Sequence, residues 1–113
     1  MATFTTVEMY STDAAASAAF MADVFQHPST LYGDSYYDVH VGDGFTVAFQ
    51  TNPEPPPPLA IFRVDDLGKM RETVIAAGGV ITVEPFDFPG GRRFQFREPG
   101  GNELSVWTPT VDR

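Results

Sequence analysis

Residues 59–83 read LAIFRVDDLGKMRETVIAAGGVITV, and this stretch decides the fold. The apolar run at 59–64 predicts a strand. The two aspartates that follow, Asp65 and Asp66, can cap a helix with apolar residues on one face. Gly78-Gly79 supplies a left-handed end for that helix, and a second strand is expected at 80–83. The stretch therefore predicts a strand–helix–strand unit.

The same order of elements occurs earlier in the chain. Residues 3–10 alternate between polar and apolar side chains and predict a strand, and Asp13 is placed to cap a helix over 14–25. Each half then continues with three short strands, expected at 30–32, 36–41 and 45–50, and at 80–83, 92–97 and 103–108. Because the capping residues Asp13 and Asp66 lie 53 positions apart, the pattern indicates a duplicated βαβββ module and an α+β fold.

A proline-rich segment separates the two halves. Residues 52–58 read NPEPPPP, which favours a stiff extended connector over a helix or a central strand. We therefore expect one domain over residues 1–113, with module one at 1–51 and module two at 59–113.

Composition excludes several classes of protein. The chain has no cysteine, which excludes a disulfide scaffold, a thiolate metal site and a cysteine nucleophile. Fifteen acidic against seven basic residues give a net charge of −8, so we expect no nucleic-acid partner, whereas a cationic ligand would be attracted. No segment resembles a membrane span or a signal peptide, so we expect no membrane partner and a cytoplasmic location.

The end of the chain carries a family signature. Glu98 to Trp107 (EPGGNELSVW) resembles the DPDGNxxELW motif of the vicinal oxygen chelate superfamily, which includes glyoxalase I, bleomycin-resistance proteins and extradiol dioxygenases. Asp13 to His27 resembles its first-helix pattern, although Gln26 stands where the family usually has glycine. Val64 to Gly79, followed by Glu84-Pro85, resembles its second strand–helix–strand.

The resemblance implies curved mixed sheets around a concave groove and, in the family's enzymes, four metal ligands facing that groove. Alignment places Thr6, Leu59 and Ser105 at three of these positions and the fourth within Val47 to Gln50. Leucine cannot bind a metal ion and hydroxyl groups are poor ligands, so we expect no metal and no cofactor. A displaced site that uses Glu8, His40 or Glu103 stays open as an alternative.

Strand periodicity predicts which side chains line the groove. If Thr6 faces it, so do the residues two and four positions along the strand, while their neighbours face the helices. The expected ligand-binding residues are Thr6, Glu8, Tyr10, Phe49, Ile61, Arg63, Glu103, Ser105 and Trp107. The alternatives to ligand binding are structural roles. Glu8 can simply pair with Arg63, His40 can be exposed, and Arg92-Arg93 can form a solvated hairpin.

These residues predict a metal-free protein that binds a small molecule. We expect an aromatic ligand, neutral or cationic, stacked on Trp107 or Tyr10, as in resistance proteins that sequester an antibiotic or a metabolite. The alternative is a lyase, isomerase or dioxygenase of the same superfamily with a displaced metal or a carboxylate base such as Glu8. Uncovered sheet edges, together with the resemblance, predict a homodimer.

Overall fold

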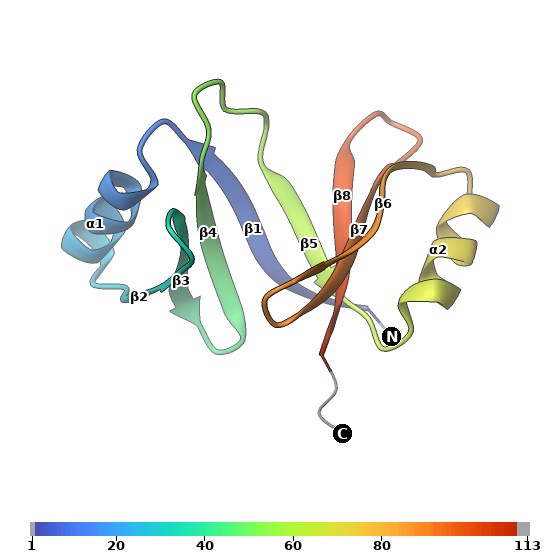
Figure 1. Cartoon of the computed structure of the whole chain (residues 1–113), viewed down its shortest axis with the longest axis horizontal. Helices are drawn as coiled ribbons and strands as arrows, with labels where there is room; N and C mark the ends of the chain where they lie inside the picture. Colours follow the sequence, from blue (N-terminus) through green and yellow to red (C-terminus); the bar gives the residue numbers. More distant parts are fainter. Residues whose placement is uncertain (1, 111–113) are drawn as a thin grey trace. The chain divides into compact units, whose positions relative to one another are not determined.

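The structure is a computed structural model that describes residues 2–110, and it contains two βαβββ modules (Figure 1). The first module comprises β1 (Thr3–Ser11), α1 (Ala14–Phe25), β2 (Ser29–Tyr32), β3 (Tyr36–Gly42) and β4 (Phe45–Thr51). The second comprises β5 (Leu59–Arg63), α2 (Leu67–Ala76), β6 (Val80–Phe88), β7 (Gly91–Arg97) and β8 (Glu103–Pro109). The predicted α+β fold with a duplicated module is confirmed.

Each module carries a mixed sheet with the same topology. The strand order is β2-β3-β4-β1 in the first module and β5-β8-β7-β6 in the second. β1 and β4 are parallel, as are β5 and β8, and the other neighbours within each module are antiparallel. The chain divides into two compact units: one is Thr5–Leu59, and the other joins the residues up to Phe4 to those from Ala60 onward. The ring of Phe4 meets that of Phe62 edge-on, with centroids 5.6 Å apart.

Matching caps start the two helices. The Ala16 N–H donates to Asp13 Oδ1 and the Lys69 N–H donates to Asp66 Oδ1, each over 3.0 Å. α1 ends where Gln26 adopts a left-handed conformation with φ of 59°, which explains why glycine is usual at this position in the family that the sequence resembles.

Each helix covers one face of its own sheet. In the first module, Ala14 and Ala18 of α1 pack against Val39 and Phe49. In the second, Leu67 and Val74 of α2 pack against Phe94 and Val106. α1 contributes small alanines to this packing, whereas α2 contributes larger aliphatic side chains.

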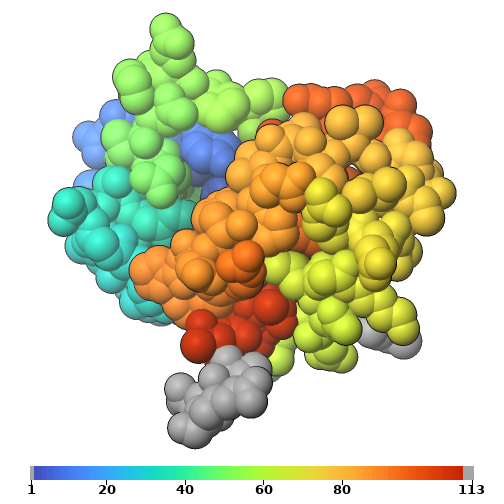
Figure 2. All heavy atoms as spheres, turned by 45° about the vertical axis from the view of Figure 1, so that its right-hand side comes forward, coloured from blue at the N-terminus to red at the C-terminus, as the bar shows by residue number. Residues whose placement is uncertain are grey.

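One strand is longer than the sequence predicts. β6 continues through Pro85 to Phe88, whereas we expected it to end at Val83. Its pairing with β7 is irregular between Ile81 and Phe86, and β6 is the outermost strand of its module. An edge strand with bulges tolerates a proline, so the strand resumes beyond it. Figure 2 shows the β6 and β7 segment, in orange, at the surface.

No helix within residues 2–110 is long and apolar enough to cross a membrane.

Candidate ligand-binding site

Each module has a sheet face on the side opposite its helix, which we call its helix-free face. In the first module, Thr6 pairs with Thr46, and Tyr10 pairs with Gln50, which in turn pairs with Tyr36. Paired residues point to the same side of a sheet, so register fixes the members of this face. They are Thr6, Glu8, Tyr10, Tyr36, Asp38, His40, Thr46, Ala48 and Gln50. The strand periodicity predicted for β1 is confirmed, because Met9 packs on the helix side.

A buried carboxylate dominates the first helix-free face. Glu8 is only 3% exposed. Its Oε2 accepts a hydrogen bond from the Tyr10 hydroxyl over 2.7 Å, and its Oε1 accepts one from the Tyr36 hydroxyl over 2.9 Å. Buried carboxylates need such donors, and hydrogen bonds to a charged acceptor are short and strong. The two phenols therefore fix the orientation of Glu8.

Other polar side chains of this face also form hydrogen bonds. The hydroxyl oxygens of Thr6 and Thr46 lie 3.1 Å apart. Gln50 Nε2 donates to the Ser35 hydroxyl over 3.2 Å. The first helix-free face is thus a preformed network of side-chain hydrogen bonds.

The second helix-free face mixes rings and guanidinium groups. Ile61 pairs with Ser105 and Arg63 with Trp107 across β5 and β8, while Gln95 and Arg93 of β7 pair with the same two residues of β8. The members of this face include Ile61, Arg63, Arg93, Gln95, Glu103, Ser105 and Trp107. The neighbouring Phe62 and Val106 pack on the helix side, which confirms the predicted periodicity of β5 and β8.

Trp107 and Phe88 form an aromatic pair on this face, which we call the Trp107 cluster together with Arg63. Its half-buried indole meets the ring of Phe88 edge-on, with centroids 6.1 Å apart and an interplanar angle of 61°. The exposed guanidinium of Arg63 lies over the indole, with Cζ 5.8 Å from the ring centroid. This is a cation–π arrangement, in which the ring's negative face attracts the guanidinium.

A polar chain runs beside this cluster. Arg93 Nη2 donates to Gln95 Oε1 over 2.7 Å, and Gln95 Nε2 donates to Glu103 Oε2 over 3.1 Å. The hydroxyl of Thr82 donates to the same Glu103 oxygen over 2.6 Å. The Arg93 guanidinium also lies over the ring of Phe86, at 5.6 Å. Hydrogen bonds within the protein thus orient the Glu103 carboxylate.

One predicted site residue lies on the wrong face, and two others lie on the expected face but are buried. Phe49 does not lie on the helix-free face, because β4 alternates and places it in the core against α1. Ser105 lies on the expected face but is fully buried, and its hydroxyl donates to the Phe94 carbonyl over 3.1 Å. Ile61 is also buried. The side chains of these three residues are therefore packing groups.

Sequence reasoning missed Tyr36, Phe88, Gln95 and Arg93 as members of these faces. Tyr36 lies opposite Gln50 because the register between β3 and β4 shifts between His40 and Gly42; without that shift Tyr37 would take this position. Arg93 was considered together with Arg92, as an anion clasp or, preferably, as part of a solvated hairpin. Arg92 fits that description, since it forms an exposed ion pair with Asp87 at 3.1 Å, whereas Arg93 is half-buried.

The three aligned metal positions do not fit a metal ion. Thr6 bonds to Thr46, Leu59 is a buried hydrocarbon, and the Ser105 hydroxyl donates to a backbone carbonyl. Within residues 2–110, no group of three histidine, cysteine, aspartate or glutamate side chains is close enough to hold a metal ion. The displaced-site alternative with His40 has no such group there; His40 Nε2 lies 2.8 Å from the Thr30 hydroxyl.

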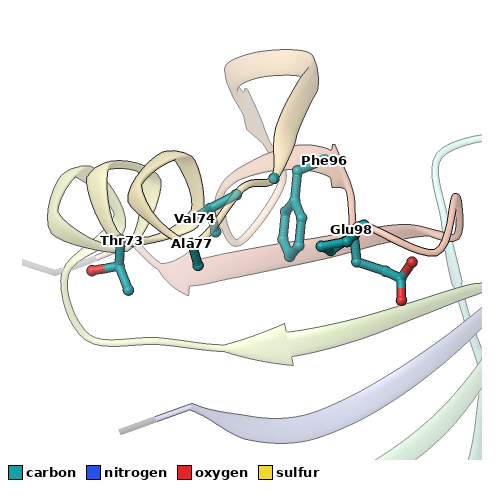
Figure 3. Close-up of a pocket in the computed structure, with 7 residues that line it drawn as sticks. Thr73, Val74, Ala77, Phe96 and Glu98 are labelled. Carbon is teal, nitrogen blue, oxygen red and sulfur yellow. The ribbon is translucent and has the colours of Figure 1, made fainter.

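A pocket lies on the helix side of the second module, away from the predicted ligand-binding residues. It encloses about 210 Å³ between α2, β7 and the turn after β7 (Figure 3). Its lining includes Val74, Ala77, Phe96 and Glu98. Pockets for drug-sized ligands usually enclose about 300–1,000 Å³. None of the predicted ligand-binding residues lines it.

Solved structures with the same fold include proteins of several activities. A methylmalonyl-CoA epimerase from Mycobacterium tuberculosis superposes with a TM-score of 0.80 at 12% identity, covering 96% of this chain and 89% of that one. The Mn(II)-bound glyoxalase from Novosphingobium aromaticivorans gives a TM-score of 0.75 at 23% identity, covering 98% of this chain and 41% of that one. Hypothetical protein BH1468 from Bacillus halodurans gives 0.83 at 8% identity, covering 99% and 97%.

At these identities the similarity shows the fold alone. No curated protein matches the chain at a significant level. The sequence profile of one family does match, over residues 3–106, which is nearly the whole chain. The chain therefore belongs to the Glyoxalase/Bleomycin resistance protein/Dioxygenase superfamily.

Proposed function

We propose that this chain is a binding protein for a small planar aromatic molecule, which it holds without a resident metal on the second helix-free face. The observation that carries the proposal is Trp107, a half-buried ring flanked by Phe88 and covered by the exposed guanidinium of Arg63. Rings with a few oriented polar groups are typical of small-molecule sites.

The charge of the ligand depends on Arg63. The sequence led us to expect a neutral or cationic ligand, with Glu8 and Glu103 as the attracting groups. Both carboxylates accept hydrogen bonds from neighbouring side chains. Within residues 2–110, the contact found for the Arg63 side chain is with Trp107. The two ion pairs found there, Arg71–Glu84 and Arg92–Asp87, do not involve Arg63. A cationic ligand would compete with Arg63 for the ring, so we favour a ligand that carries a carboxylate.

Fluorescence tests this proposal directly because Trp107 is the only tryptophan. We would titrate the protein with three probes that share one ring system: methylnaphthalene, naphthylmethylammonium and naphthoate. The proposal predicts saturable quenching at one probe per chain, strongest with naphthoate. Tightest binding of the ammonium probe would restore the original charge assignment, and no saturable quenching by any probe would refute the proposed site.

Calorimetric titration of two variants tests whether Trp107 and Arg63 contribute to the free energy of ligand binding. Trp107→Ala should weaken naphthoate binding by about 1–3 kcal/mol, as is common for a buried ring at a binding site. Arg63→Gln should remove the preference for naphthoate over methylnaphthalene. Val80→Ala, a change at a side chain that is 64% exposed on β6, serves as the control and should bind as the wild type does. Unchanged affinity in Trp107→Ala would contradict the assignment.

Glu8 favours a second candidate function, proton transfer at a carbon acid. Its carboxylate is buried and is held by two phenol groups. As a general base it would take a proton from the carbon next to a carbonyl, leaving an enolate, and would return that proton in the reverse step. One of the similar structures is a methylmalonyl-CoA epimerase, so that thioester is a reasonable probe.

Hydrogen–deuterium exchange tests this second candidate. Methylmalonyl-CoA would be incubated with the protein in deuterated buffer and its α-proton followed by NMR. Enzymatic exchange that disappears in Glu8→Gln would establish the catalytic role. If the α-proton exchanges only at the uncatalysed rate in the presence of the wild-type protein, the proton-transfer function is excluded and the binding function is retained.

A further inference from the structure

We infer that the proline-rich connector, residues 52–58, is a docking segment for a partner domain that has an aromatic-lined groove. The connector reads NPEPPPP and joins β4 to β5. The proposed binding function makes no use of it, so the inference does not depend on the proposed ligand.

The sequence of the connector restricts its backbone conformation. A proline ring holds φ at about −65°, and the residue before a proline is driven from the helical region toward extended backbone. Pro55, Pro56 and Pro57 meet both conditions, and the peptide bonds of the connector are trans. Residues 55–58 belong to neither a helix nor a strand. They therefore favour a left-handed polyproline helix about 12 Å long.

The fold fixes both ends of the connector. At its start, the Asn52 N–H donates to the Ser11 carbonyl over 2.7 Å, and the Glu54 N–H donates to Asn52 Oδ1 over 2.8 Å. At its end, Leu59 is 2% exposed and begins β5. The proline run is thus held in place before any partner binds, and a segment that is already ordered loses little conformational freedom on binding.

The proline rings face solvent. Residues 53–58 are all exposed, and Figure 2 shows the connector, in green at the top of the view, projecting from the surface. Prolines that only stiffen a loop act by fixing φ, which does not require a continuous run of exposed rings. A polyproline helix has three residues per turn, so Pro55 and Pro58 lie on the same edge. The connector therefore presents an apolar ridge that its own module does not cover.

The hydrogen-bonding groups of the connector indicate the chemistry of the partner. Among residues 53–58 only Glu54 has a backbone N–H, and that N–H already donates to Asn52. The segment otherwise offers carbonyl acceptors and apolar rings, so the partner has to supply donors and flat apolar surface. Tryptophan and tyrosine supply both in one side chain. Aromatic-lined grooves of this kind bind proline-rich segments in WW and EVH1 domains.

The charge near the connector restricts the rim of the partner's groove. Glu54 is the charged residue of the connector, and residues 1–62 contain seven acidic residues but neither lysine nor arginine. An acidic rim would be repelled by this part of the chain. We therefore expect a groove whose rim is neutral or basic.

NMR titration of two purified probe domains with the full chain tests the inference. The probes are a WW domain and an EVH1 domain, each isotope-labelled and chosen for a neutral or basic groove rim. At least one should show saturable shifts in its groove residues, with a dissociation constant below about 1 mM. The double variant Pro55→Ala and Pro56→Ala should weaken this binding by about tenfold or more, because it loses two rings and the fixed φ. Pro99→Ala, at an exposed proline after β7, is the matched control and should bind like the wild type.

A synthetic peptide of residues 51–60 tests whether the fold presents the segment. Because both ends are fixed in the full chain, the chain should bind the probe domain about threefold or more tightly than the peptide does. A peptide that binds as tightly as the chain, or more tightly, would overturn the inference. If neither domain binds the wild-type chain and the double variant only lowers the melting temperature, the prolines merely stiffen the loop, which would overturn it as well. Unchanged binding by the double variant would do the same.

Discussion

The two modules share one architecture but differ in what their surfaces offer. Both begin with a strand and a helix capped by aspartate, and both order their strands in the same way. On the helix side, α1 is apolar and α2 is charged. All seven lysine and arginine residues lie from Arg63 onward. Duplication thus preserved the backbone pattern while the surface residues diverged.

The helix-free faces differ in a parallel way. In the first module, Glu8, Tyr10 and Tyr36 satisfy one another through short hydrogen bonds. In the second, Arg63 and Trp107 present a ring and a guanidinium at a half-exposed surface. A network that is internally satisfied stabilises the fold, whereas an exposed cation over a ring is suited to recognise a ligand. The comparison favours a stabilising role for the first face and supports the proposal that the second face binds a ligand.

The largest expected effect tests the structural role of the first face. Tyr36→Phe removes one hydroxyl donor from the buried Glu8 carboxylate, and loss of a hydrogen bond to a charged group costs about 1.5–3 kcal/mol. The free energy of unfolding from urea titration measures this cost. Tyr32→Phe, at a side chain that is 46% exposed, is the control and should cost little. If both substitutions lower the free energy of unfolding by the same amount, the hydrogen bond from Tyr36 to Glu8 does not stabilise the fold.

The helix caps test whether the modules are equivalent where their backbones match. Asp13→Ala and Asp66→Ala each remove a carboxylate that accepts from the first turn, and loss of such a cap costs about 1 kcal/mol. We expect the same shift in thermal unfolding from both substitutions within experimental error. A large difference would show that the two helices do not contribute to stability in the same way.

The smallest expected effect concerns a charged contact that only the second module has. Arg71 donates two hydrogen bonds to Glu84, and these bonds, more than charge attraction alone, lower the pKa of Glu84 below its ordinary value of 4.5. A lowered carboxyl pKa contributes stability above the unfolded pKa, and that contribution is lost as pH falls through the folded pKa. Because the pair is exposed, the contribution is small.

The free energy of unfolding of the wild type and of Glu84→Gln, measured as a function of pH, gives the size of this contribution. The wild type should lose slightly more stability than Glu84→Gln does as pH falls below about 4.5, the ordinary carboxyl value. A wild type that loses no more stability than the variant would show that the contact with Arg71 is not formed in solution.

Much of the fold could be predicted from the sequence because its signals are local. The helix expected at 14–25 is confirmed with the same boundaries, since Asp13 caps it and left-handed Gln26 ends it. The missed part of β6 depends on a non-local property. Pro85 argues against a strand unless that strand lies at a sheet edge, and edge position follows from topology.

The candidate site was less predictable because its residues come from neighbouring strands. Periodicity along one strand correctly grouped Thr6 with Glu8, and Arg63 with Trp107 across parallel strands. To place Tyr36 and Arg93 on these faces, one must know how neighbouring strands are paired, and the sequence does not give that register. For the same reason Phe49 was predicted on the wrong face of its strand. The fate of a hydroxyl, such as that of Ser105, depends on packing that no sequence pattern contains.

The most direct test of the central claim is a fluorescence titration of Trp107 with naphthoate before and after treatment of the protein with EDTA. If the second helix-free face binds its ligand through the ring and Arg63 alone, the two titrations will give the same dissociation constant. Quenching that disappears after EDTA and returns with added Mn²⁺, Ni²⁺ or Zn²⁺ would contradict the claim and assign the site to a metal.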